Sequence, residues 1–240
     1  MAWIISSSST QNGTFVPVDG AAFHAHMDAL KMKRFGRLGD TLLYTSGVPL
    51  SPPPGPGPLR LRNIGHVPYW FHLLSTHAGI AVSDTVRGLI EAVEPGEHAF
   101  YPVQIDYTPV PEDPDYSPRE GHADIGPMPE PYFLINIQRC IRALDLERGE
   151  ADGHLQVHVI PEKTRPFRLS DYRVALTLYP RPDLPPRLFV DTAAIKGRAV
   201  WQECGGNDHM IFMSDALVEQ IRALPHGFGG LAPKYPLGEV

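Results

Sequence analysis

The sequence contains one thirteen-residue phrase twice, first as Ile80-Ala-Val-Ser83-Asp84-Thr-Val86-Arg-Gly-Leu89-Ile90-Glu-Ala92 and again as Ile211-Phe-Met-Ser214-Asp215-Ala-Leu217-Val218-Glu-Gln-Ile221-Arg-Ala223. Each copy is a short apolar run, then Ser-Asp, then apolar residues at the three- and four-residue spacing of an amphipathic helix. The pattern predicts a strand that leads directly into a helix with one buried face. The predicted apolar stripes are Val86, Leu89, Ile90 and Val93 in the first helix, and Leu217, Val218, Ile221 and Leu224 in the second.

The Ser-Asp pair in each phrase is typical of the start of a helix. Ser83 and Ser214 stand where an N-cap hydroxyl accepts a free backbone N–H. Asp84 and Asp215 place negative charge at the positive end of the helix dipole. We therefore interpret all four residues as structural caps and not as catalytic groups.

The composition describes a globular chain with a substantial core. Of its 240 residues, 42% are hydrophobic and 20% are charged, which fits one large domain or two small ones. The net charge of −6 provides no diffuse basic field for nucleic acid, and no apolar stretch is long enough to span a membrane. The sequence shows no secretory signal, and the two cysteines are far apart. These features favour a cytoplasmic protein with free thiols.

Strand-like segments outnumber helical ones. Besides the two phrases, a helix is predicted over residues 21–33, and strands over residues 3–7, 98–107, 132–137, 155–160, 173–179 and 199–201. Pro102 lies inside one of these strands, which predicts an edge position for it. The order lacks a regular alternation of strands and helices. The sequence therefore predicts an α+β fold with a mixed, mostly antiparallel sheet, a few amphipathic helices and long Pro-rich loops.

Negative charge is concentrated between residues 106 and 130. This segment holds seven acids and one arginine, so its net charge equals that of the whole chain. Several prolines stiffen it, and long loops inside compact domains are often functional.

One segment suggests nucleophilic chemistry. Cys204 lies five residues before His209, and a basic neighbour can lower the pKa of a thiol. The intervening Gly-Gly-Asn-Asp between two strand-like runs is, however, common in hairpin turns, and we favour that interpretation. No set of three convergent metal ligands is apparent, so we expect neither a metal nor a cofactor.

Several segments occur in a characteristic order with the repeated phrase. They are residues 80–93, Phe100-Tyr-Pro102-Val103-Gln-Ile105, Tyr132-Phe-Leu-Ile-Asn136-Ile-Gln-Arg-Cys140, Leu144-Asp145, and residues 211–224 followed by Gly229-Gly230-Leu231. In this order and spacing, residues 68–235 resemble immunity protein family eleven of bacterial polymorphic toxin systems. The resemblance implies an immunity-protein-like α+β domain over residues 66–240. Residues 1–65 have no clear counterpart in it, which leaves open an added element or a divergent N-terminal region, and we expect them to pack on the rest. The acidic segment is longer than the resemblance leads one to expect.

By this resemblance, the protein is a non-enzymatic antitoxin that binds and neutralises a cognate toxin, for example a nuclease. Nuclease toxins are commonly basic, so we expect the acidic segment to contribute to the toxin-facing surface. The residues expected there are Glu112, Asp113, Asp115 and Glu120. We expect neither nucleic acid nor a membrane as a partner, and the sequence does not indicate an oligomeric state.

Two other functions remain open at the level of sequence. The first is a small cysteine-dependent hydrolase or transferase that uses Cys204 and His209. The second is a non-catalytic scaffold protein whose Pro-rich segments bind partners in an extended conformation.

Overall fold

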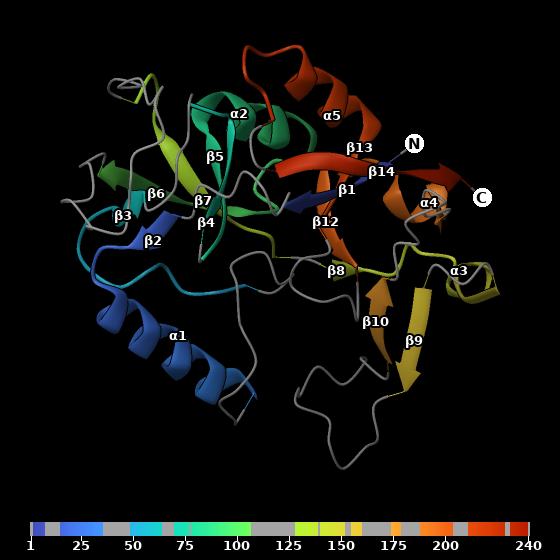
Figure 1. Ribbon diagram of the computed structural model, residues 1–240, viewed down its shortest axis with the longest axis horizontal. Helices are drawn as coiled ribbons and strands as arrows, with labels where there is room; N and C mark the ends of the chain where they lie inside the picture. Colours follow the sequence, from blue (N-terminus) through green and yellow to red (C-terminus); the bar gives the residue numbers. More distant parts are fainter. Residues whose placement is uncertain are drawn as a thin grey trace, which may run out of the picture.

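The computed structural model describes residues 2–7, 15–35, 49–63, 70–76, 78–106, 128–138, 140–151, 155–159, 174–178, 188–203, 211–228 and 231–239. Figure 1 shows its helices and strands coloured in their order along the chain. The first half contains β1 (Ala2–Ser7), β2 (Phe15–Pro17), α1 (Gly20–Phe35), β3 (Leu59–Asn63), β4 (Leu73–Thr76), β5 (Gly79–Ser83), α2 (Asp84–Val93) and β6 (Ala99–Asp106). The second half contains β7 (Tyr132–Asn136), β8 (Cys140–Ile141), α3 (Leu146–Ala151), β9 (Leu155–Val159), β10 (Val174–Leu178), β11 (Phe189–Val190), α4 (Thr192–Ile195), β12 (Val200–Glu203), β13 (Ile211–Ser214), α5 (Asp215–Arg222) and β14 (Leu231–Glu239).

Six strands form a closed barrel in the order β2-β3-β6-β7-β5-β4. Neighbours are antiparallel at β2–β3, β6–β7, β7–β5 and β5–β4, and parallel at β3–β6. A parallel contact between β2 and β4 closes the ring. The barrel core is apolar and includes Phe15, Leu59, Leu61, Leu74, Val103 and Leu134.

A second sheet of six strands has the order β11-β14-β1-β13-β12-β8. Neighbours are antiparallel at β14–β1, β1–β13 and β13–β12, and parallel at β11–β14 and β12–β8. An antiparallel bridge from Leu144, just after β8, to Val190 of β11 curls this sheet back on itself. Its own core includes Ala2, Ile4, Leu188, Val190, Trp201, Phe212 and Leu237. The hairpin β9–β10 forms a separate two-stranded sheet.

The two six-stranded sheets share one arrangement. The order β2-β4-β5-β7-β6-β3 in the barrel matches β8-β12-β13-β1-β14-β11, with the same parallel or antiparallel sense at each pair. β1 belongs to the first half of the chain but occupies, in the second sheet, the place that β7 occupies in the barrel. The fold is therefore a tandem repeat in which each repeat gives its first strand to the sheet of the other.

The strand registers align the two repeats residue by residue. Ser83 pairs with Tyr132 in the barrel as Ser214 pairs with Ala2 in the second sheet. The strands beyond these partners, β6 and β14, then carry two Tyr-Pro sequences in equivalent positions, Tyr101-Pro102 and Tyr235-Pro236. The repeated Ser-Asp phrase is thus one part of a larger repeat.

Helices α2 and α5 lie side by side across the seam between the two sheets (Figure 1). Their apolar stripes pack into a third core with residues of both sheets, and this core includes Ile5, Val82, Val86, Ile90, Ile135, Met213, Leu217, Val218 and Ile221. Full burial of one such side chain contributes about 1.5–3 kcal/mol. The phrase repeats because each copy supplies half of this shared core.

Two predictions about individual residues are wrong. Val93 is 47% exposed, because α2 ends there and the next residue, Glu94, turns toward β12 instead. Pro102 lies in an interior strand, since β6 has β3 on one side and β7 on the other. The proline is tolerated because β3 begins opposite Val103, so no β3 residue pairs with Pro102.

The predicted fold class is confirmed: the protein is α+β, with mixed, mostly antiparallel sheets and amphipathic helices. The first 65 residues contribute to both sheets. β1 lies between β13 and β14, while β2 and β3 are barrel strands.

Candidate functional site

The four Ser-Asp residues lie where each apolar strand passes into its helix. Ser83 Oγ accepts the N–H of Val86, and Ser214 Oγ accepts the N–H of Leu217, both at 3.3 Å. Both serines are the N-cap residues of their helices, as the sequence indicated.

The two aspartates open the first turns and also reach neighbouring side chains. Asp84 forms an ion pair with Arg87 at 2.9 Å, and Asp215 accepts the indole N–H of Trp3 at 2.7 Å. The Asp215 contact joins α5 to β1, whereas the Asp84 ion pair lies within the first turn of α2, and both are consistent with structural roles for the capping residues.

The residues expected to face a toxin, Glu112, Asp113, Asp115 and Glu120, lie outside the described residues. So do Cys204 and His209 of the alternative enzymatic site. The structure therefore does not place either group.

The structure does describe the end of the acidic segment, at Glu130. Its Oε2 accepts the backbone N–H of Thr85 at 2.9 Å and the hydroxyl of the same residue at 2.7 Å. The N–H of Asp84 donates to the carbonyl of Pro131 at 2.8 Å. Because these donors lie in the first turn of α2, the last acid of the segment is held at the positive end of a helix dipole.

A histidine joins this anchor to the cap of α2. His72 Nδ1 lies 2.7 Å from Ser83 Oγ and 3.2 Å from Glu130 Oε1. Burial lowers the pKa of His72, partly offset by the charge of Glu130 and assisted by that of His226. We therefore expect neutral His72 at neutral pH, which makes its contact with Glu130 a polar contact and not an ion pair.

A serine, a histidine and a carboxylate in contact raise the question of catalysis. A catalytic triad uses both ring nitrogens, with the hydroxyl on one and the carboxylate on the other. Here Nδ1 faces both groups, and Ser83 is fully buried with its oxygen already accepting an N–H of the helix. The geometry assigns this cluster to anchoring the acidic segment.

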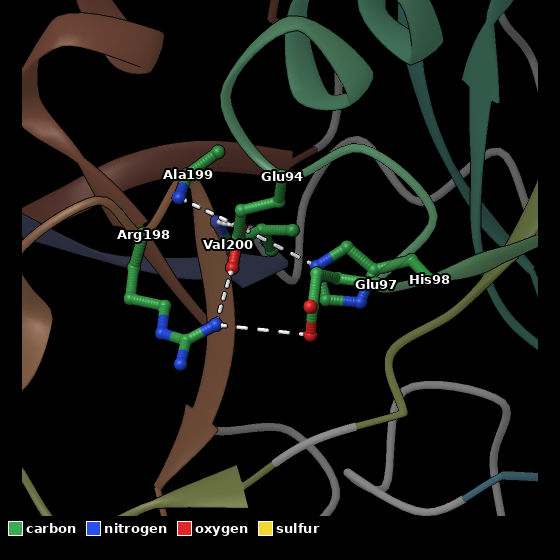
Figure 2. Close-up of polar contacts among 6 residues, drawn as sticks. All are labelled: Glu94, Glu97, His98, Arg198, Ala199 and Val200. Atoms are coloured by element: carbon green, nitrogen blue, oxygen red, sulfur yellow. Dashed lines mark hydrogen bonds and ion pairs between the residues drawn. The ribbon is translucent and has the colours of Figure 1, made fainter.

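A second polar cluster fastens the two repeats together at Glu94 (Figure 2). Glu94 caps the C-terminus of α2, and its side chain is 2% exposed. Its Oε2 accepts the backbone N–H groups of Ala199 at 2.7 Å and Val200 at 3.0 Å, where β12 begins. Arg198 Nη1 donates to Oε1 at 3.1 Å, and His98 Nε2 lies 3.4 Å from Oε2.

These donors set the ionisation of Glu94. Burial alone would raise its pKa, but hydrogen bonds from His98, Val200 and Ala199 outweigh burial and lower the pKa to about 2. The carboxylate is therefore charged at neutral pH, and its hydrogen-bond partners come from both repeats.

A second buried carboxylate, Glu203, has the opposite property. It ends β12 and accepts the backbone N–H groups of Ala143 at 3.1 Å and Leu144 at 3.3 Å. Burial raises its pKa to about 7 in spite of these hydrogen bonds. Among the described residues, its hydrogen bonds come from the backbone that closes the second sheet.

Sequence reasoning missed Glu94, His72, Glu130 and Glu203 as interacting groups. Apart from His98, four residues after Glu94, their partners are backbone atoms or side chains more distant in sequence, so no distinctive local motif marks them. Within the described residues, no group of three or more His, Cys, Asp or Glu side chains could hold a metal ion. Across the same residues, no helix combines the length and apolar character needed to cross a membrane.

No protein family model matches the chain, and no curated protein is significantly similar to it.

Proposed function

We propose that this protein is an immunity-type antitoxin that binds a cognate bacterial toxin in the cytoplasm and blocks it. The order of its motifs supports this proposal through the resemblance to an immunity protein family. Its acidic segment supports it through charge, since rim charges of one sign speed encounter with a partner of the opposite sign. A basic toxin, such as a nuclease, is the partner that this charge favours.

The observation that carries the proposal is the connection between β6 and β7. The two strands are antiparallel neighbours, with Val103 opposite Tyr132, and a two-residue turn is enough to join such a pair. The chain instead inserts the acidic residues between Asp106 and Pro131 and fastens the last of them, Glu130, to α2. The fold does not need this length or charge, so we attribute both to a binding role.

The test begins with the identity of the partner. The tagged protein is purified from cells that express it with its neighbouring genes, and a stoichiometric co-purifying protein is identified by mass spectrometry. The association rate of the complex is then measured across a range of salt concentrations. The quadruple variant Glu112→Gln, Asp113→Asn, Asp115→Asn and Glu120→Gln is compared with the wild type.

We expect the quadruple variant to associate more slowly and with a flatter salt dependence, because rim charges act mainly on the association rate. A control variant with the same change in net charge neutralises four exposed acids on helices: Asp28, Glu91, Glu147 and Glu219. The proposed role of the acidic segment fails if both variants associate at the same rate at low salt.

A further inference from the structure

A pocket of about 370 Å³ lies beside the barrel. It is formed by the start of α1, the Pro-rich stretch of residues 54–58, and the neighbouring strands β3 and β6. Its walls are mostly apolar, with Phe23 and the prolines, and its polar lining includes Arg60 and Gln104. Volumes of this size are typical of sites that enclose a small ligand or a single side chain.

The second repeat contains a position that is structurally equivalent to this pocket. On the strands, Arg60 pairs with Gln104 in the first repeat as Phe189 pairs with Gly238 in the second. The aligned registers of the two sheets make these pairs equivalent.

The helices that border the two places are equivalent as well. Asp19 Oδ1 accepts the N–H of Ala22 at the start of α1, and Asp145 Oδ1 accepts the N–H of Arg148 at the start of α3, both at 3.0 Å. Ala22 therefore stands where Arg148 stands in the second repeat.

In the second repeat, the ring of Phe189 occupies the position equivalent to the pocket. The guanidinium of Arg148 lies 3.2 Å from the ring centre of Phe189. On another side, the ring lies against Gly238, where an added Cβ would come within 2.5 Å of it. The absence of a side chain at Gly238 thus gives the ring its room.

We infer that the pocket of the first repeat receives an aromatic side chain of the protein partner, an inference that rests on the proposed antitoxin function. The small Ala22 leaves open the volume that Arg148 covers, and Arg60 replaces the phenylalanine at the equivalent strand position. Proline rings and Phe23 provide apolar walls for a ring, and the guanidinium of Arg60 is suited to stacking on one. Buried aromatic anchors are the groups that most often dominate binding energy at protein interfaces.

The pocket lies near the point where the acidic segment begins. Gln104 lines it from β6, and the acidic segment begins two residues later at Asp106. The expected partner surface therefore has an aromatic anchor beside a basic patch.

A glycine in the pocket wall allows the site to be filled. Gly57 lines the pocket, and a Cβ added there meets no atom within 4 Å, so Gly57→Phe adds a ring at the pocket wall without strain and is expected to obstruct the pocket. Gly88 on the exposed side of α2 is equally open and provides the matched control Gly88→Phe. We expect Gly57→Phe to weaken binding of the co-purified toxin by about tenfold or more, and Gly88→Phe to leave it unchanged.

A second measurement needs no toxin. The full chain is titrated with N-acetyl-tryptophanamide, with N-acetyl-alaninamide as the control probe, while the amide signals of Ala22, Gly55 and Gly57 are followed by NMR. We expect saturable shifts with the aromatic probe alone, and their loss in Gly57→Phe but not in Gly88→Phe.

The outcomes separate this inference from the proposed function. Absence of saturable shifts overturns the aromatic site, whether or not a toxin binds. Loss of the probe site in Gly57→Phe with unchanged toxin affinity shows that the pocket serves another ligand and overturns the assignment to the toxin. Saturable shifts in a protein that binds no toxin contradict the proposed function while leaving an aromatic-binding pocket.

Discussion

Replacing Glu94 by glutamine should loosen the junction between the two repeats. The side chain of Glu94 accepts two backbone N–H groups at the start of β12, a hydrogen bond from Arg198 and one from His98 (Figure 2). Glutamine has the same shape but no charge, and one of its two acceptor oxygens becomes an NH₂ group that faces donors. The substitution therefore weakens charge-assisted hydrogen bonds and leaves at least one buried donor poorly paired.

The magnitude follows from the ionisation of the carboxyl group. Its pKa is lowered from the ordinary value of 4.5 to about 2, and a difference of one in pKa between the unfolded and folded states corresponds to about 1.36 kcal/mol. Glu94 then contributes on the order of 3 kcal/mol to the free energy of unfolding at neutral pH. Because the folded-state pKa is the lower one, this contribution is complete above pH 4.5 and is lost as the pH falls toward 2.

Urea denaturation followed by circular dichroism measures the effect at pH 7 and at intervals down to pH 3. We expect Glu94→Gln to be less stable than the wild type by about 3 kcal/mol at pH 7, with a difference that shrinks as the wild type becomes protonated. Glu91→Gln, an exposed neighbour on α2, is the control and should change stability by less than about 1 kcal/mol. Equal stability of Glu94→Gln and the wild type at pH 7 would refute the role assigned to this carboxylate.

Three further perturbations test other parts of the account. Glu203→Gln should gain stability relative to the wild type as the pH rises from 5 to 8, because burial raises the pKa of Glu203 to about 7 and its ionisation in the folded state is unfavourable. Denaturation of both proteins at pH 5 and pH 8 measures the difference in stability. The same difference at both pH values would contradict the prediction. Ile90→Ala and Ile221→Ala, equivalent positions in the shared core, should each cost about 2–5 kcal/mol, and calorimetry should show one unfolding transition because both repeats build that core, whereas two separate transitions would argue against it. Cys204→Ala should leave protection against the toxin intact, since the proposed function needs no thiol; loss of protection with normal folding would instead favour the hydrolase or transferase alternative.

The parts of the fold that the sequence predicted are those with local signals. The Ser-Asp caps and their apolar stripes place α2 and α5, because capping and helical spacing depend on residues within two turns. The helix predicted at residues 21–33 and most predicted strands are also present. Val93 departs from its stripe because the chain leaves the helix at that position, which spacing alone does not show.

The strands that the sequence did not predict depend on pairing with strands far away in the chain. β14 carries Pro233 and Pro236 and has no strand-like alternation, yet it pairs with β1 on one side and with β11 on the other. β3 and β4 were missed for the same reason, since their partners stabilise them more than their own residues do. A comparison of Tyr101-Pro102 with Tyr235-Pro236 could have revealed the larger repeat, but the exchange of β1 and β7 leaves no trace in local sequence.

The candidate site likewise has some features that are visible in the sequence and others that are not. The concentration of acids before residue 130 is visible in the sequence, and so is the Pro-rich stretch that lines the pocket. The anchoring of Glu130 on α2 and the contrast between Ala22 and Arg148 depend on contacts between segments far apart in the chain. Those contacts are available only once the two repeats have been aligned in three dimensions.

The most direct test of the proposed function is protection from toxicity. The toxin candidate encoded beside this protein is expressed from an inducible promoter, with or without the intact chain, and growth is measured together with complex formation after purification. The antitoxin proposal predicts that cells with the chain grow normally and that the two proteins purify as a stoichiometric complex. Growth arrest that the chain does not relieve, with no complex recovered, would contradict it.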